Sequence, residues 1–142
     1  MLRLVIDTNV LIAALIRKNT APYHLYKAWR DGAFELITSQ AQWDELARVM
    51  AYAKLRRYFS LEEAHEMLTG ITVYSIRVMH LPMVFHSPDP DDNLILATAI
   101  AGEAHYIVSG DKKDMLALGR VEGIPIITVR RAVEILESEG KS

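Results

Sequence analysis

Short runs rich in apolar residues alternate along the chain with longer stretches that carry helical periodicity. The short runs are typical of strands that are buried on both faces of a sheet. Strands that alternate with helices favour a parallel sheet with helices on both sides. We therefore predict an α/β fold, a single three-layer α/β/α domain over residues 1–142 with a central, mostly parallel sheet. Strands are expected at residues 2–6, 34–38, 74–79, 105–109 and 124–129.

The predicted helices are bounded by residues that favour helix ends. Ser39 with Gln42, and Ser60 with Glu63, have the spacing of a capping box, in which each side chain satisfies the other's backbone N–H. Pro88 and Pro90 place a loop at residues 82–90, and the most apolar helix is expected to begin at Asp91 or Asp92. Helices are expected at residues 10–17, 21–31, 39–53, 60–69, 93–101, 113–118 and 131–139, with a turn at residues 7–9.

Composition narrows the class of protein. Apolar residues make up 51% and charged residues 24% of the chain, as in ordinary globular domains. The absence of cysteine excludes disulfide scaffolds, thiol catalysis and cysteine zinc sites. Asp7 and Asn9 interrupt the first apolar stretch, so neither a secretion signal nor a membrane span is predicted there. We therefore expect a cytoplasmic protein with no membrane contact.

Acidic residues stand at positions that a parallel sheet would bring together. Asp7 directly follows the first predicted strand, and Asp111 lies just after the fourth. The carboxyl ends of parallel strands open onto one crevice, so both side chains should face it. Glu45 and Asp92 lie in or near the first turns of two predicted helices. Because clustered carboxylates repel one another, such a group favours a hard divalent cation, Mg²⁺ or Mn²⁺.

Each of these acids also has an ordinary structural interpretation. Asp7 and Asp92 are suited to capping a helix, where Asp is strongly favoured. Asp111 follows Gly110 and could serve in a turn. Glu45 borders an apolar stripe and could be a solvated charge. Both interpretations stay open on these residues alone.

Taken in order, the motifs resemble those of the PIN-domain nucleases. The resemblance covers residues 3 to about 130, and the segment from Asp89 to Asn93 is similar to the stand-alone prokaryotic PIN proteins of toxin–antitoxin systems. The motifs are Asp7-Thr8-Asn9, Glu45, Asp92-x-x-Ile95-x-Ala97-Thr98-Ala99 and Ser109-x-Asp111.

The resemblance implies a PIN-like fold and an endoribonuclease activity that depends on Mg²⁺ or Mn²⁺. It also implies that the protein is the toxin of a toxin–antitoxin pair, with an antitoxin as partner and a homodimer as its oligomeric state. Asp92 is preferred to Asp91 because its spacing to Ile95 fits, and Glu45 is preferred to Asp44 for its residue type. The implied catalytic and metal-binding residues are Asp7, Glu45, Asp92 and Asp111, supported by Asn9 and Ser109.

RNA would have to approach a chain of formal charge −2 through local basic residues. The candidates are Lys112, Lys113, Lys54, Arg56 and Arg57.

Two alternatives to a nuclease remain. A haloacid-dehalogenase-like phosphatase would use Asp7 as nucleophile, but Asn9 occupies the place of its second aspartate. A non-catalytic RNA-binding PIN module is the other, against which the intact set of acids argues.

Overall fold

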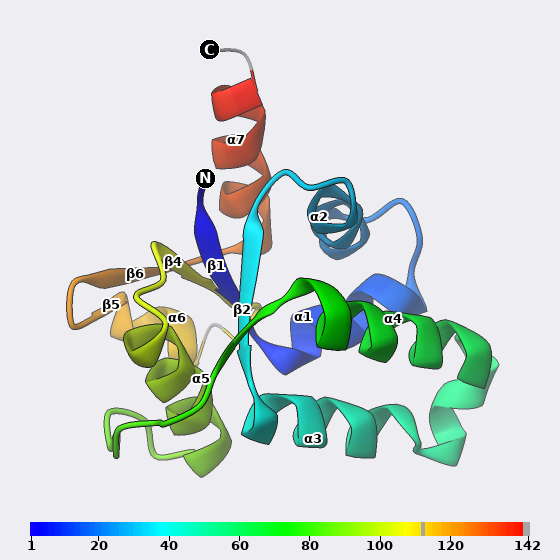
Figure 1. The fold of residues 1–142 in the computed structure, drawn as a ribbon, viewed down its shortest axis with the longest axis horizontal. Helices are drawn as coiled ribbons and strands as arrows, with labels where there is room; N and C mark the ends of the chain where they lie inside the picture. Colours follow the sequence, from blue (N-terminus) through cyan, green and yellow to red (C-terminus); the bar gives the residue numbers. More distant parts are fainter. Residues whose placement is uncertain (112, 141–142) are drawn as a thin grey trace.

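The computed structural model describes residues 1–111 and 113–140, and its strands form one twisted sheet between two layers of helices (Figure 1). Strand order across the sheet is β3-β2-β1-β4-β6-β5. Neighbours from β3 to β6 are parallel, and β5 pairs antiparallel with β6. The strands are β1 (Arg3–Ile6), β2 (Glu35–Ser39), β3 (Ile76–Val78), β4 (Tyr106–Val108), β5 (Arg120–Val121) and β6 (Ile124–Ile127). The predicted α/β architecture is confirmed.

The helices fill the connections between parallel strands. None of the described helices is both long and apolar enough to cross a membrane. They are α1 (Thr8–Ile16), α2 (Ala21–Arg30), α3 (Gln40–Met50), the 3₁₀ helix η1 (Ala53–Arg57), α4 (Leu61–Tyr74), α5 (Pro90–Ala101), α6 (Met115–Leu118) and α7 (Val129–Gly140).

Alternation along β1 divides the core into two layers. Leu4 and Ile6 pack in the cluster formed with α1, α2, α3, α4 and α7, whereas Val5 packs in the cluster formed with α5 and α6. All three side chains are at most 1% exposed. A strand with no exposed face explains why the sequence shows a continuous apolar run here instead of alternation.

Two element predictions were wrong in part. The helix expected to end near Thr69 continues to Tyr74, because Gly70 lies inside α4, where the Arg30 side chain packs against it. The short strand β5 was not predicted. It forms a hairpin with β6 through Glu122 and Gly123, both with positive φ, a two-residue turn for which Asn-Gly or Asp-Gly is the usual signal.

The sheet opens at the carboxyl end of its central strand. The β1–β2 register covers Arg3–Glu35 and Leu4–Leu36, whereas the β1–β4 register continues to Ile6–Val108. From β1 the chain adds β2 and β3 on one side and then β4 on the other, so the topological switch point lies between β1 and β4. Ligands of open α/β sheets bind outside the carboxyl ends of the strands at such a switch point. The residues that follow β1 and β4 therefore lie at the expected place for a site.

Candidate metal centre

Asp7 leaves β1 at the sheet's carboxyl edge and precedes α1. It occupies the N-cap position, yet its side chain makes no capping hydrogen bond. Instead Ser109 Oγ donates to Asp7 Oδ2 at 2.9 Å, and the same Oγ accepts from the backbone N–H of Asp111 at 3.1 Å. One hydroxyl thus links the acids that follow two adjacent strands.

The electrostatic environment of Asp7 disfavours its charge. Burial raises the pKa of this carboxyl, which is only 7% exposed, and the negative charge of Asp111 raises it further. The hydrogen bond from Ser109 and the nearby backbone N–H groups of Asn9 and Thr8 act in the opposite direction, because they stabilise the ionised form. Asp7 is therefore held in place by a donor while lacking a cationic partner.

Asp92 enters the same site from the first turn of α5. The N-cap of α5 is Asp89, which accepts from the N–H of Asp91 at 2.9 Å, so Asp92 is not the capping residue. Ser87 Oγ donates to Asp92 Oδ2 at 2.9 Å. Burial raises the pKa of Asp92 to about 6, and the charges of Asp89, Asp7 and Asp111 contribute.

Asp91, the neighbour of Asp92, is exposed, whereas Asp92 is buried and faces the other acids. Helix α3 presents a similar pair. Asp44 is exposed and accepts from Gln40 Nε2 at 2.8 Å, whereas Glu45 is half-buried. Burial raises the pKa of Glu45, and the charges of Asp91 and Asp7 add to the effect. Of each adjacent pair, the residue chosen from the sequence is the less exposed one.

Asp114 is an acid that the sequence did not point to. Carboxylate oxygens of Asp92, Asp111 and Asp114 all lie within 4.8 Å of one another. Asp111 Oδ1 accepts from the N–H groups of Lys113 and Asp114, at 3.1 and 3.3 Å, which folds the segment back on itself. The turn interpretation of Asp111 and its place in the cluster are thus both correct. The spacing Asp111-x-x-Asp114 was the available signal.

The residues present fit a hard divalent cation. Within residues 1–111 and 113–140, none of the clustered carboxylates forms a salt bridge, although the charge of Arg48 lowers the pKa of Glu45. Thr8 is 1% exposed and its hydroxyl makes no hydrogen bond of ordinary geometry, although it lies close enough to Glu45 to lower the pKa of that carboxyl. Carboxylates and an orphaned hydroxyl form an all-oxygen donor set, which Mg²⁺ and Mn²⁺ prefer.

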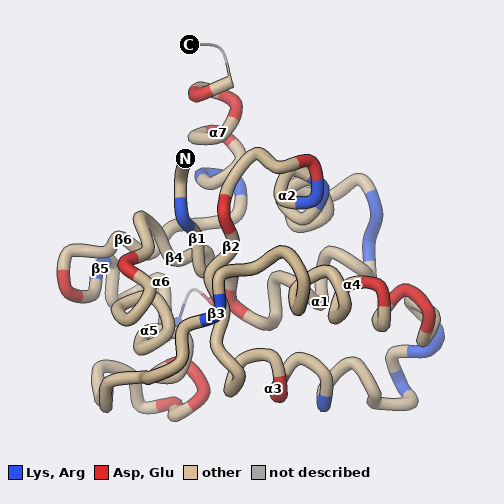
Figure 2. Tube along the Cα trace, viewed as in Figure 1, with Lys and Arg blue, Asp and Glu red and all other residues tan. Residues whose placement is uncertain are grey.

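Of the other residues predicted to support the site or to bind RNA, some lie close to the clustered acids along the chain and others lie on a different part of the fold. Asn9 is exposed in the first turn of α1, and Lys113 is exposed two residues after Asp111. Lys112 falls outside the described residues. The basic residues of η1 lie beyond the C-terminal end of α3, far from the N-terminus of α5 (Figure 2).

Within η1, the three basic side chains differ. Arg56 is half-buried: its guanidinium donates to the Met50 carbonyl oxygen and lies over the Phe59 ring. Lys54 and Arg57 are exposed. Arg56 is therefore engaged in packing, whereas the other two side chains reach solvent.

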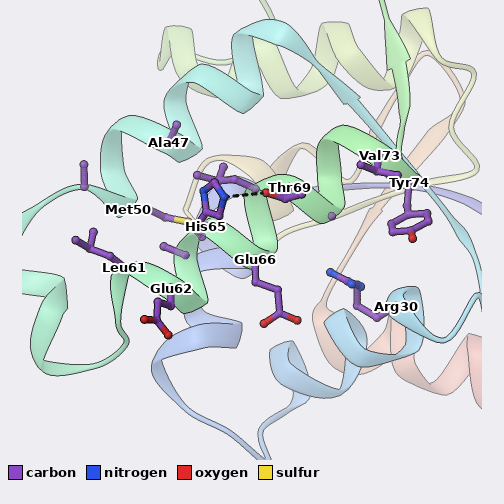
Figure 3. Close-up of a pocket in the computed structure, with 14 residues that line it drawn as sticks. Arg30, Ala47, Met50, Leu61, Glu62, His65, Glu66, Thr69, Val73 and Tyr74 are labelled. Atoms are coloured by element: carbon purple, nitrogen blue, oxygen red, sulfur yellow. Dashed lines mark hydrogen bonds between the residues drawn. The ribbon is translucent and has the colours of Figure 1, made fainter.

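A separate cleft of about 900 Å³ lies between α3 and α4 (Figure 3). Its walls include Met50 and the exposed side chains of Leu61 and Val73, and its rim carries Glu62 and Glu66. None of the clustered acids lines it. This cleft is apolar and lacks the convergent polar groups of the metal centre, so the chemistry is expected at the acids instead.

Loss of the Asp92 charge is predicted to stabilise the metal-free protein. The pKa of Asp92 is raised from 3.8 to about 6, so between those pH values the folded state retains a proton that the unfolded state has lost. The free energy of unfolding therefore falls as pH rises through this window. Asp92→Asn, which keeps an acceptor for Ser87, should raise that free energy at pH 7.5 by on the order of 2 kcal/mol.

The measurement is urea unfolding in EDTA at pH 5 and pH 7.5. The exposed Asp44→Asn is the matched control and should change stability by less than about 0.5 kcal/mol. A lower stability of Asp92→Asn at pH 7.5 would contradict the environment described for this carboxyl.

A solved structure resembles the chain in fold, and a family profile matches its sequence. The crystal structure of VapBC2 from Rickettsia felis, bound to a DNA fragment from their promoter, matches with a TM-score of 0.60 and 14% sequence identity, covering 89% of this chain and 98% of that chain. At that identity the likeness shows the fold. No curated protein sequence gives a significant match. The profile of the PIN domain matches residues 3–113, most of the sequence. The chain therefore belongs to the PIN domain family.

Proposed function

We propose that this protein is an endoribonuclease that depends on Mg²⁺ or Mn²⁺ and acts as the toxin of a toxin–antitoxin pair. The observation that carries the proposal is the meeting of Asp92, Asp111 and Asp114, with Asp7 bonded to Ser109 beside them. Membership of the PIN family, whose members are typically nucleases, supports the same reaction class.

The clustered residues have distinct parts in this proposal. Asp7, Glu45, Asp92 and Asp111 would hold the cation, with Asp114 as a further carboxylate. Ser109 and Ser87 would fix the orientation of two of these carboxylates through the hydrogen bonds they donate. A bound divalent cation supplies an activated water and polarises a phosphodiester oxygen.

The two alternatives are less well supported. A phosphatase with Asp7 as nucleophile would need a second acid at position 9, where Asn9 is exposed. A non-catalytic RNA-binding module would gain nothing from buried carboxylates that repel one another, since such groups reduce the stability of the fold.

Metal-dependent cleavage is expected to require the buried acids. Asp7→Asn and Asp92→Asn should each reduce cleavage of a labelled single-stranded RNA in Mn²⁺ by more than about 100-fold, because partners of metal ligands alone contribute about 10- to 100-fold. EDTA should abolish wild-type cleavage. Asp44→Asn is the control and should cleave normally. Turnover of p-nitrophenyl phosphate without RNA cleavage would favour the phosphatase instead.

Lys113 is proposed to contact the RNA backbone beside the cluster. It is exposed and its N–H is bonded to Asp111, so its position is tied to that acid. In an inactive Asp7→Asn background, Lys113→Ala should weaken RNA binding and reduce the slope of log affinity against log salt by about 0.7, the value for one single-strand phosphate contact. Lys27→Ala, an exposed lysine on α2, removes the same charge and serves as control. An unchanged slope for Lys113→Ala would show that it makes no phosphate contact.

The antitoxin is proposed to dock in the cleft between α3 and α4. The matching structure from Rickettsia felis is of the complex VapBC2. Here the cleft is lined by exposed Leu61 and Val73, by the acids Glu62 and Glu66, and by Arg30 of α2 (Figure 3). Such a surface suits an amphipathic segment that buries apolar side chains and carries Lys or Arg at its edges.

If this docking is correct, Val73→Asp should lose co-purification with a co-expressed cognate antitoxin, while RNA cleavage persists. The exposed Val73 can accept a charge without loss of core packing, since it is 62% exposed. Glu137→Lys on α7, another exposed position, is the control. Retention of the partner by Val73→Asp would place its binding elsewhere.

A further inference from the structure

A buried glutamine occupies the opening between β1 and β2. Gln42 lies in the first turn of α3 and is 3% exposed. Its Nε2 donates to the carbonyl oxygen of Ile6 at 2.6 Å, and its Oε1 accepts from Thr38 Oγ1 at 3.2 Å. The β1–β2 register stops before Ile6, so the side-chain amide spans the two strands where their backbones no longer pair.

This use of Gln42 differs from helix capping. Ser39 accepts from the backbone N–H of Gln42, which is half of the capping box that the sequence predicted. In the reciprocal half, the Ser39 N–H would donate to Gln42 Oε1; here Oε1 accepts from Thr38 Oγ1 instead, and Nε2 donates to the Ile6 carbonyl oxygen. A local role would have kept that side chain within α3, whereas its actual partners lie on both neighbouring strands.

The same hydroxyl of Ser39 extends the contact to α5. Thr98 Oγ1 donates to the Leu94 carbonyl oxygen at 2.7 Å, so in its 2.9 Å bond with Ser39 Oγ it is the acceptor. Thr98, Ser39 and Gln42 are all buried. Their hydrogen bonds join β1, β2, α3 and α5, which carry or precede the acids of the metal centre.

The position of Gln42 ties together two of those acids. Its partner Ile6 directly precedes Asp7. Glu45 follows Gln42 by three residues, so Gln42 and Glu45 lie on one face of α3. Asp7 raises the pKa of Glu45 through its charge, so the two carboxylates repel one another. A bond between α3 and the end of β1 opposes the separation that this repulsion favours.

We propose that Gln42 is a positioning residue that sets the separation of Asp7 and Glu45 for cation binding. The inference rests on the proposed metal-dependent function. Gln42 does not touch the cation or the RNA; it acts through the backbone of Ile6 and through α3.

The test compares Gln42→Met with Thr38→Val. Methionine has a similar length but provides neither hydrogen bond. Thr38→Val removes the bonds of the Thr38 hydroxyl to Gln42 Oε1 and to the Ser39 carbonyl oxygen, and leaves the link from Gln42 to Ile6. We expect Gln42→Met to weaken Mn²⁺ binding by about 10-fold or more, as loss of a partner that orients a ligand does. Thr38→Val should change it by less than about two-fold. Calorimetric titration of folded protein with Mn²⁺ gives both values, and circular dichroism verifies the fold.

A double-mutant cycle separates positioning from general stability. If Gln42 acts through Glu45, then Gln42→Met should cause little further loss of Mn²⁺ affinity in a Glu45→Gln background. Equal losses in both backgrounds, or wild-type affinity of Gln42→Met, would overturn the inference. If the Gln42→Met variant does not fold, Gln42→Asn replaces it. Asparagine keeps the amide on a side chain that is shorter by one methylene, and we expect an Mn²⁺ affinity below that of the wild type.

The experiments distinguish failure of the proposed nuclease function from failure of the proposed role of Gln42. Wild-type protein that binds Mn²⁺ without cleaving RNA would refute the nuclease and leave the role of Gln42 measurable. Wild-type protein that binds no Mn²⁺ would refute both.

Discussion

Repulsion among buried and half-buried carboxylates is the physical constraint that the other residues of this site counteract. Burial raises the pKa values of Asp7, Glu45 and Asp92, and neighbouring acids raise each further. Two serines oppose the effect in the same way. Ser109 and Ser87 each donate to one buried carboxylate and accept an N–H from the residue two positions later. Accepting that N–H directs the single hydroxyl proton toward the acid.

The fold supplies these acids from segments distant in sequence. From the central β1, the chain builds β2 and β3 on one side and then β4 and β6 on the other (Figure 1). The reversal leaves a crevice beside β1, and α5 brings Asp92 to it from the opposite layer. A site assembled this way depends on the register between strands, since a one-residue shift would turn Asp7 into the core.

The sequence predicted what depends on local pattern. Apolar runs located the long strands, because such a run is a property of neighbouring residues. The order of the acidic motifs along the chain identified the family. It did not predict Gln42 as a bridge, since the capping spacing with Ser39 offered a sufficient local explanation. Asp114 and the hairpin of β5 were missed for a related reason: a two-residue strand has no periodicity, and an acid in a short loop resembles any solvated charge.

The raised pKa of Asp92 has an evolutionary consequence. Random substitutions that remove this buried charge make the metal-free fold more stable, and proteins under selection for stability alone would drift toward them. This chain nonetheless carries a buried acid after β1, a half-buried one on α3 and a buried one on α5. Under the proposed metal-dependent function, cation binding at these acids would offset the stability that the metal-free fold would gain by losing them.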